Sequence, residues 1–261
     1  MDEKLQWVKN HWNQTADSDW YRSLRTEERI LALHQNPQVA FHPAVYSLLR
    51  KHIPDLRGKE VLLPSSGDNH AAFAFALMGA NVTSADISEK QLENAQRIAK
   101  QLVLNIHFVC EDTMRLTQMA DNTYDLVYTS NGTHSWIDQL DPMYQNIHRV
   151  LKHGGISILY DVHPFQRPFT GEAWQQPTIC KAYSDTLPDC HWRVQDLVNA
   201  QINAGLEIKE MAELTAIDAS FWFPYHELIQ QEPEKLREVN NWQRNPLAAL
   251  PAWISIVAEK H

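Results

Sequence analysis

The sequence predicts an α/β protein with a parallel sheet and helices on both faces. From residue 58 onward, short apolar runs alternate with helix-like segments at intervals of about 20–25 residues, which is typical of such sheets. The chain has 261 residues, of which 44% are hydrophobic, enough for one large domain or a domain with an added cover. It contains only eight glycines but nine tryptophans. The few glycines leave little room for glycine-rich phosphate loops.

The first 57 residues predict short helices that precede the sheet. Aromatic and polar residues recur there with helical spacing, and Pro43 and Pro54 interrupt them. Two groups of apolar residues would form the buried faces of these helices: Ile30, Leu31 and Leu33, then Val45, Leu48 and Leu49. We expect residues 1–57 to form a helical lid.

The first predicted strand is the apolar run 61–63, which stops at Pro64. A helix of small residues follows over 71–78. Gly79 suits the left-handed position just beyond a helix end.

The second predicted strand spans residues 82–86 and ends on the carboxylate Asp86. Ser88 then resembles a helix N-cap, and Gln91 three residues later completes a capping-box pattern. The helix that follows, over 89–102, carries its apolar residues on one stripe.

Three more strands and one helix extend the alternation. Residues 106–110 and 124–129 are short apolar runs bounded by acidic or turn-forming residues. A helix predicted over 143–151 is halted by Gly154-Gly155, and the strand 156–161 follows.

The C-terminal part is less regular. A helix is predicted over 192–204, ending at Gly205, and strands are predicted near 206–211 and over 252–260. The segments 163–190 and 214–250 are rich in prolines and aromatics without a clear period. We expect them to be irregular cover segments of one domain that spans residues 58–261.

Charge and cysteine content limit the class of protein. The 23 basic and 32 acidic residues, a formal charge of −9, argue against a general nucleic-acid surface. No apolar run reaches the roughly 18 residues of a membrane span, and the N-terminus lacks the apolar stretch of a secretory signal. The three cysteines are odd in number and widely spaced, which suits a reducing cytosol and argues against a zinc site. We therefore expect a cytoplasmic protein with neither a membrane segment nor a metal.

Polar residues follow the predicted strands at the place where a ligand would bind. In an open parallel sheet, ligands lie outside the carboxyl ends of the strands. Asp86, roughly 20 positions past the first loop, is placed to accept hydrogen bonds from a ribose diol. Asp112 is placed to accept one from the exocyclic amine of a base. Either carboxylate alone reads as an ordinary loop residue or cap, but the two together favour a nucleoside site.

Residues 58–161 resemble the cofactor-binding core of class I S-adenosylmethionine-dependent methyltransferases, of the type 11-like, small-molecule kind. The resemblance is carried by the segments GKEVLLPSSGDN, NVTSADIS, HFVCEDT and YDLVYTSNG, and by IHRVLKHGGISIL, which is especially characteristic. It implies a Rossmann-like seven-stranded sheet with an antiparallel seventh strand, and S-adenosyl-L-methionine as cofactor. The cofactor-binding residues that it implies are Ser65, Ser66, Gly67, Asp86, Ile87, Asp112, Thr113 and Ser130.

The first loop departs from the acidic-x-Gly-x-Gly-x-Gly pattern of the family. Leu63 replaces the acid, Ser65 the first glycine and Asn69 the third, whereas Gly67 remains where the backbone must approach the cofactor closely. Because asparagine tolerates positive φ better than most residues, we expect Asn69 to preserve the turn. The missing acid bears on how tightly the amino-acid end of the cofactor is held.

Methyl transfer from a sulfonium is an in-line displacement, so alignment supplies most of the catalysis. A general base is needed only if the acceptor has a proton to lose. His134 and His163, after the fourth and fifth strands, are candidate bases, and polar wall residues are the alternative. Tryptophans in the lid and cover segments predict an aromatic acceptor pocket, with core burial as the alternative: Trp7, Trp12, Trp20, Trp136, Trp174, Trp192 and Trp222.

These features predict an enzyme that methylates a small molecule on an oxygen, nitrogen or carbon atom. The altered first loop supports a second hypothesis, a non-catalytic relative that binds the cofactor or another nucleoside as a sensor. A nicotinamide-dependent oxidoreductase is disfavoured because no GxGxxG follows the first strand. The Asp/Asn-Pro-Pro-aromatic signature of nucleobase-methylating relatives is absent, although a structured RNA stays open as a substrate. The sequence makes no prediction of the oligomeric state.

Overall fold

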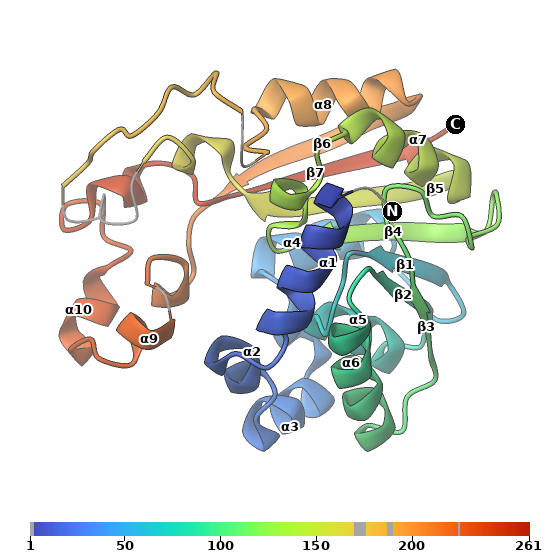
Figure 1. Ribbon diagram of the computed structural model, residues 1–261, viewed down its shortest axis with the longest axis horizontal. Coiled ribbons are helices and arrows are strands. Elements are labelled where there is room, and N and C mark those ends of the chain that lie inside the picture. Colours follow the sequence, from blue (N-terminus) through green and yellow to red (C-terminus); the bar gives the residue numbers. More distant parts are fainter. Residues whose placement is uncertain (1–2, 170–175, 187–189, 224) are drawn as a thin grey trace.

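A computed structural model of the protein describes residues 3–169, 176–186, 190–223 and 225–261, without the side chain of Tyr225. Its centre is a seven-stranded sheet with the strand order β3-β2-β1-β4-β5-β7-β6 (Figure 1). The strands are β1 (Glu60–Pro64), β2 (Asn81–Asp86), β3 (Ile106–Cys110), β4 (Tyr124–Ser130), β5 (Leu151–Val162), β6 (Leu206–Leu214) and β7 (Trp253–Lys260). β1 to β5 are parallel, and β7 runs antiparallel to both β5 and β6. The predicted α/β class and the antiparallel seventh strand are confirmed.

Helices cover both faces of this sheet (Figure 1). The α-helices are α1 (Glu3–Thr15), α2 (Asp19–Leu24), α3 (Glu27–Gln35), α4 (Pro43–His52), α5 (His70–Leu77), α6 (Glu89–Gln101), α7 (Leu140–Val150), α8 (Val194–Asn203), α9 (Tyr225–Leu228) and α10 (Pro233–Glu238). Short 3₁₀ helices are η1 (Pro37–Ala40), η2 (Thr133–Trp136), η3 (Pro164–Gln166), η4 (Ala219–Phe221) and η5 (Pro246–Ala249). None of the helices that the structure describes is long and apolar enough to cross a membrane.

Two hydrophobic cores lie on the two sides of the sheet. Leu62 and Val127 belong to the core shared with α7 and α8. Leu63 and Leu126 belong to the core shared with α3, α4, α5 and α6. Neighbouring strand residues point to opposite faces, so a strand that is buried on both sides must be apolar throughout. This explains the continuous apolar run of the first strand.

The start of β5 differs most from the prediction. β5 begins at Leu151, which pairs with Tyr124 before the register shifts. Gly155 lies within this irregular stretch, where a Cβ would come within 2.8 Å of the Lys152 carbonyl oxygen. The two glycines therefore do not end the preceding helix, which already stops at Val150. Gly155 lets the strand bulge where no side chain fits, and Gly154 adopts a left-handed φ of +73° that strains other residues.

The predicted capping box of α6 is only half formed. Ser88 Oγ accepts a hydrogen bond from the Gln91 backbone N–H at 3.1 Å, as expected for an N-cap. The Ser88 backbone N–H, however, donates to Asp86 Oδ1 at 2.8 Å rather than to Gln91. The carboxylate at the end of β2 takes the place of the glutamine because it is closer along the chain.

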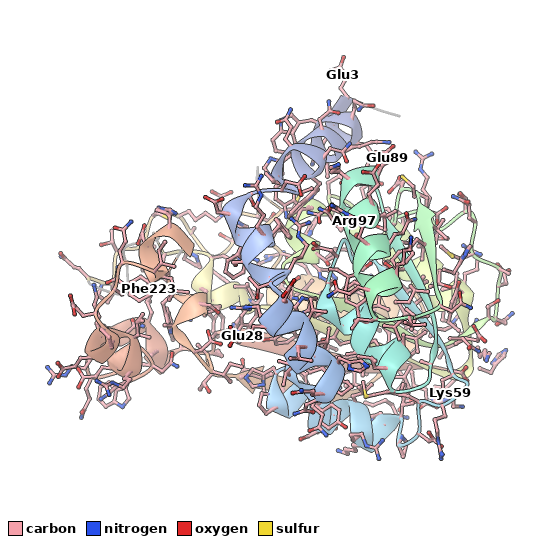
Figure 2. All side chains as sticks on the ribbon, turned by 90° about the horizontal axis from the view of Figure 1, so that it is seen from below. Glu3, Glu28, Lys59, Glu89, Arg97 and Phe223 are labelled. Atoms are coloured by element: carbon pink, nitrogen blue, oxygen red, sulfur yellow. The ribbon has the colours of Figure 1, made fainter. Side chains whose placement is uncertain are left out.

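The N-terminal helices contact the sheet domain through apolar packing and through polar bonds. α3 and α4 contribute Leu33 and Leu49 to the core under the sheet. α1 passes the start of α6, near Glu89 in Figure 2, where Asn13 Oδ1 accepts a hydrogen bond from Ser88 Oγ at 2.7 Å. Leu31, predicted on a buried face, is 56% exposed because Ile30 and Leu33 occupy the buried stripe of α3.

The segment 214–250 forms a small lobe beside the sheet, at the left of Figure 1. It contains α9 and α10 and is more helical than predicted. Its residues share a core with Ala252, which lies just beyond the segment; the other members are Ala216, Ala219, Trp222, Phe223, Val239 and Leu247. Among the described residues of 163–190 are η3 and an isolated bridge between Phe169 and Ile179. Trp174 lies outside the described residues.

Candidate active site

The loop that follows β1 has an unusual backbone. Ser65 has a φ of +52° and Gly67 a φ of +51°, both in the left-handed region. Asn69 has a φ of −60° and is the N-cap of α5, where its Oδ1 accepts from the Ala71 N–H at 2.9 Å. The expectation that Asn69 adopts a positive φ is wrong, because Ser65 takes the left-handed conformation instead. A serine there is strained, which a glycine would not be.

This first loop is hydrogen-bonded to residues in or just after three other parallel strands, β2, β3 and β4. Four hydrogen bonds make the connection: Ser65 Oγ with Thr113 Oγ1 at 2.5 Å, Ser66 Oγ with Ser84 Oγ at 2.6 Å, Gly67 N with Asp86 Oδ2 at 2.8 Å, and Asn69 Nδ2 with Ser130 Oγ at 2.8 Å. Six of the eight residues expected to bind the cofactor are therefore brought together: Ser65, Ser66, Gly67, Asp86, Thr113 and Ser130. They lie at the carboxyl edge, by which we mean the edge of the sheet where the parallel strands end.

Asp86 is a tightly constrained carboxylate at this edge. It is 8% exposed, and its two oxygens accept from the backbone N–H groups of Gly67 and Ser88. Burial raises the pKa of Asp86 to about 6, although these backbone donors favour the ionised form. The carboxylate is thereby held in one orientation at the end of β2, as a group that binds a ligand must be.

The other two expected residues, Ile87 and Asp112, bond to residues outside the first loop. Ile87 is half-buried, and its carbonyl oxygen accepts from the thiol of Cys110 at 3.6 Å. Asp112 Oδ1 accepts from the Met114 N–H at 3.1 Å, and its Oδ2 lies 3.2 Å from Arg115 Nε. Asp112 thus stabilises its own turn, and its contact with a base stays a prediction.

His134, a residue of η2, is buried in a polar network. Its Nδ1 lies 2.9 Å from Asp161 Oδ2, and its Nε2 lies 2.9 Å from the Tyr144 hydroxyl. Burial alone would raise the pKa of Asp161, but His134 and Arg167 hold that pKa below its ordinary value. To take a proton from an acceptor, His134 would have to give up one of these bonds. Its role as a general base stays a prediction.

His163 is also engaged at both ring nitrogens. Nδ1 accepts from the Phe165 N–H at 3.1 Å, which makes His163 the N-cap of η3, and Nε2 lies 3.0 Å from Glu213 Oε1. Burial lowers the pKa of His163 in spite of that carboxylate. The side chain is fully buried, so its role as a general base likewise stays a prediction.

Aromatic side chains gather over the carboxyl edge, beside the end of β4. The ring of Trp136, in η2, lies 6.1 Å from that of Trp7, 4.8 Å from that of His11 and 4.9 Å from that of Trp12. We call these four residues the α1 aromatic cluster. It fastens α1 to the loop after β4, and Tyr21 of α2 packs edge-on against Trp12.

A second aromatic group lies where β5 and β7 meet the lobe. Trp253, at the start of β7, is 4.9 Å from the ring of Tyr160 and 4.9 Å from that of Phe221. Trp222 and Trp192, which were predicted to line an acceptor pocket, are engaged in other contacts. Trp222 is buried in the lobe core, and Trp192 Nε1 donates to the Ile137 carbonyl at 2.8 Å.

Sequence reasoning did not single out Arg25 and Asp68 as a pair. Asp68 lies in the first loop and Arg25 is the C-cap of α2, and their side chains meet at 3.2 Å. The sequence did offer one indication for Asp68, because it is a carboxylate in the first loop, where Leu63 replaces the acid of the family. Nothing in the local sequence indicates which cation would meet it.

Comparison with known proteins places this geometry in a family. Residues 63–159 match the family model described as a methyltransferase domain. The chain is 29% identical over 160 residues to the uncharacterized methyltransferase YbaJ of Bacillus subtilis, and the match spans 61% of each protein. It is 30% identical over 180 residues to the uncharacterized methyltransferase sll0829 of Synechocystis, which covers 69% of this chain and 77% of that protein.

Two further similarities concern proteins with named activities. Over 100 residues the chain is 33% identical to the ubiquinone biosynthesis O-methyltransferase of Coxiella burnetii, which covers 38% of this chain and 42% of that enzyme. The structure of geranyl diphosphate C-methyltransferase from Streptomyces coelicolor, in complex with S-adenosyl-L-homocysteine, matches all of this chain and 99% of that one, with a TM-score of 0.63 and 14% identity. The latter similarity concerns the fold alone. The family model and the relatives show that this chain belongs to the class I S-adenosylmethionine-dependent methyltransferases.

Proposed function

We propose that this methyltransferase methylates a small, largely apolar acceptor bound between its two aromatic groups. The observation that supports this proposal most is the aromatic lining of the carboxyl edge. The α1 aromatic cluster stands beside the end of β4, and the rings around Trp253 stand beside the end of β5. Flat apolar molecules gain most from such surfaces, through area burial and ring stacking.

The residues of the first loop fit the expected cofactor. When bound, S-adenosylmethionine supplies a methyl group that its sulfonium activates for transfer. Asp86 would accept hydrogen bonds from a ribose diol, and the loop from Ser65 to Gly67 would bring backbone close to the cofactor. Thr113 and Ser130 hold that loop through Ser65 and Asn69. Buried polar atoms without partners next to the same loop indicate that the site suits a polar ligand.

Alignment of the acceptor would account for most of the rate. The chain holds the edge rigidly, because Asp161 bonds to the ring and the backbone N–H of His134 and lies 3.8 Å from Arg167. Helix α1 and the lobe would exclude water from the acceptor. His134 and His163 are the proposed bases for an acceptor that must lose a proton, on condition that one of their present bonds opens.

Two arguments support a small molecule over a macromolecule. The net charge of −9 is unfavourable for a polyanionic substrate. The relative with a named activity, from Coxiella burnetii, acts in ubiquinone biosynthesis by its name, and we propose an acceptor of comparable apolar character for this chain.

The test is methyl transfer from S-adenosylmethionine labelled in its methyl group to a panel of acceptors. The panel holds phenols and quinols with and without an isoprenoid tail, isoprenoid diphosphates, fatty acids, amines and a structured RNA. We expect label in the apolar members and none with Asp86→Asn, which keeps the size of the side chain but loses its charge. Asp55→Asn, an exposed carboxylate paired with Arg57, is the matched control and should transfer as the wild type does.

The outcome also separates the alternatives. Transfer to amines or RNA alone would contradict the proposed acceptor class. Calorimetric binding of the cofactor without transfer to any member of the panel would favour the sensor hypothesis.

A further inference from the structure

Several buried polar atoms around the first loop lack a hydrogen-bond partner in the part of the chain that the structure describes. They are Arg25 Nη1, Asp68 Oδ2 and Gln91 Oε1. Gln91 belongs to α6, and its Oε1 lies 3.5 Å from the point where a Cβ on Gly67 would stand. Since buried polar groups are nearly always bonded, such a cluster at one place needs an explanation. A polar ligand at the first loop would supply it.

Arg25 is held so that one of its two terminal nitrogens faces this loop. Its Nη2 donates to the Ala16 carbonyl at 2.8 Å and to Asp17 Oδ1 at 3.1 Å. Asn94 Nδ2 donates to the same two oxygens, each at 3.2 Å, which ties them to α6. The guanidinium is thus anchored through Nη2, and Nη1 remains directed at Asp68.

Asp68 is the carboxylate that faces Nη1. Its side chain is 4% exposed and that of Arg25 13%, and their atoms lie 3.2 Å apart with no hydrogen bond of good geometry between them. A buried ion pair repays the cost of desolvation only when its hydrogen bonds are well formed. The geometry of this ion pair therefore does not suit a contact that only stabilises the fold.

The amino-acid end of the cofactor carries one positive and one negative group, which are complementary in charge to Asp68 and Arg25. It carries one ammonium and one carboxylate, and the acid that the family usually places near it is replaced here by Leu63, which is buried in the core. We propose that Asp68 and Arg25 form a zwitterion clamp, in which Asp68 binds the α-ammonium of the cofactor and Arg25 binds its α-carboxylate. This inference rests on the cofactor site described above, because it places the clamp at the same first loop.

The clamp explains how the chain tolerates the loss of the family acid. The positive charge of Arg25 comes from α2, so the lid itself would contribute to cofactor binding. Tyr21, on the same helix, lies close enough to Asp68 and Asp86 that their charges raise its pKa further above its ordinary value, after burial as the main cause. Its hydroxyl therefore stays neutral beside the clamp.

Three ligands test the clamp by calorimetry, without any methyl acceptor. S-adenosyl-L-homocysteine has both charged groups, its decarboxylated analogue keeps only the ammonium, and 5′-methylthioadenosine has neither. The variants are Arg25→Gln and Asp68→Asn. Arg22→Gln is the matched control, because Arg22 is on the same helix, 67% exposed, and pairs only with Asp19 at 3.8 Å among the described residues.

We expect each variant to bind S-adenosyl-L-homocysteine about 10- to 100-fold more weakly, as the loss of a charge-assisted bond implies. Binding of 5′-methylthioadenosine should change less than about twofold, which also shows that the variant is folded. The decarboxylated analogue should be sensitive to Asp68→Asn and insensitive to Arg25→Gln. Arg22→Gln should leave all three affinities unchanged.

The clamp is overturned if the variants bind S-adenosyl-L-homocysteine as the wild type does, or if they lose all three ligands equally while remaining folded by circular dichroism. Failure of the proposed function looks different. In that case the wild type itself binds neither S-adenosyl-L-homocysteine nor 5′-methylthioadenosine.

Discussion

Asp86 and Asp68 are carboxylates that become buried when the protein folds. Asp68 lies in the first loop, and Asp86 accepts a hydrogen bond from it. Burial raises the pKa of both side chains to about 6. Arg25 opposes the effect of burial on Asp68, whereas the charges of Asp86 and Asp17 add to it. The folded protein thus holds two carboxyl groups that take up protons well above the pH at which an exposed aspartate does.

This raised pKa predicts a pH dependence of ligand binding. In the proposed site the ionised carboxylates bind the ribose diol and the ammonium. A protonated group would then have to lose its proton on binding, so the affinity should fall as the pH drops through about 6. We expect the calorimetric affinity for S-adenosyl-L-homocysteine to be constant near pH 7.5 and to fall by up to about tenfold per unit for each group below pH 6. In Asp68→Asn only Asp86 still titrates, so the logarithm of the affinity should fall with pH at half the slope of the wild type. A constant affinity down to pH 5 in the wild type would contradict the assignment of these carboxylates to the site.

At the scale of the elements, the ends of α5 and α6 show one motif with two different residues. After α5, the Gly79 N–H bonds to the Ala76 carbonyl and the Ala80 N–H to the Phe75 carbonyl. After α6, Val103 bonds to Lys100 and Leu104 to Ala99 in the same way. Both are Schellman motifs, in which the residue after the cap is left-handed. Gly79 accepts a φ of +89° freely, whereas Val103 is strained at +55°.

Replacing Val103 by glycine should therefore stabilise the protein. The side chain is 91% exposed and packs against little, so the main effect is the relief of a β-branched residue in the left-handed region. We expect the free energy of unfolding to rise by about 1 kcal/mol, as measured by urea denaturation. Ile202→Gly is the control, since Ile202 is 52% exposed within α8 and the change should lower stability by about 0.5–1 kcal/mol. A loss of stability in Val103→Gly would show that the strain is not present in solution.

At the scale of the whole molecule, chain segments from both ends of the sequence meet over the carboxyl edge. α1 is fixed there by the α1 aromatic cluster and by Asn13, while the lobe begins and ends beside the last strands (Figure 1). The His163 N–H donates to the Ala252 carbonyl at 2.8 Å, which joins the end of β5 to the return of the lobe. The proposed acceptor site would therefore be enclosed by parts that are far apart in the sequence. Residues 1–57 as a separate lid remain a prediction.

The attachment of α1 through one aromatic residue can be measured. Trp136→Ala removes the ring that contacts Trp7, His11 and Trp12, so we expect faster amide hydrogen exchange in α1 and unchanged exchange in β1 and β4. Trp242→Ala, at a 60% exposed tryptophan outside the cluster, is the matched control. Exchange that rises equally in the sheet would mean that Trp136 supports the core and not the attachment of α1.

Most of the sheet could be predicted from the sequence, because its signals are local. Apolar runs such as 61–63 need only their own composition to indicate a strand buried on both faces. Asp86 could be placed at a strand end for the same reason. The conformations of Ser65 and Asn69 could not, since both residues tolerate several backbone states and their neighbours decide between them.

Contacts between segments that are far apart in the sequence could not be predicted from local sequence patterns. His134 was recognisable as a residue after the fourth strand, but its bonds to Asp161 and Tyr144 depend on how β5 and α7 pack. The capping box at Ser88 failed for a similar reason, because Asp86 competes for the same donor.

The sequence by itself determined the class of fold, the order of strands and helices around the cofactor loop, and the polar residues at the carboxyl edge. These follow from the period and composition of short segments, which act over one element at a time. Only the tertiary structure decided that Ser65 takes the left-handed turn, that Arg25 meets Asp68, and that α1 closes over η2. Such contacts depend on charge and shape brought together by packing, and no spacing along the chain records them.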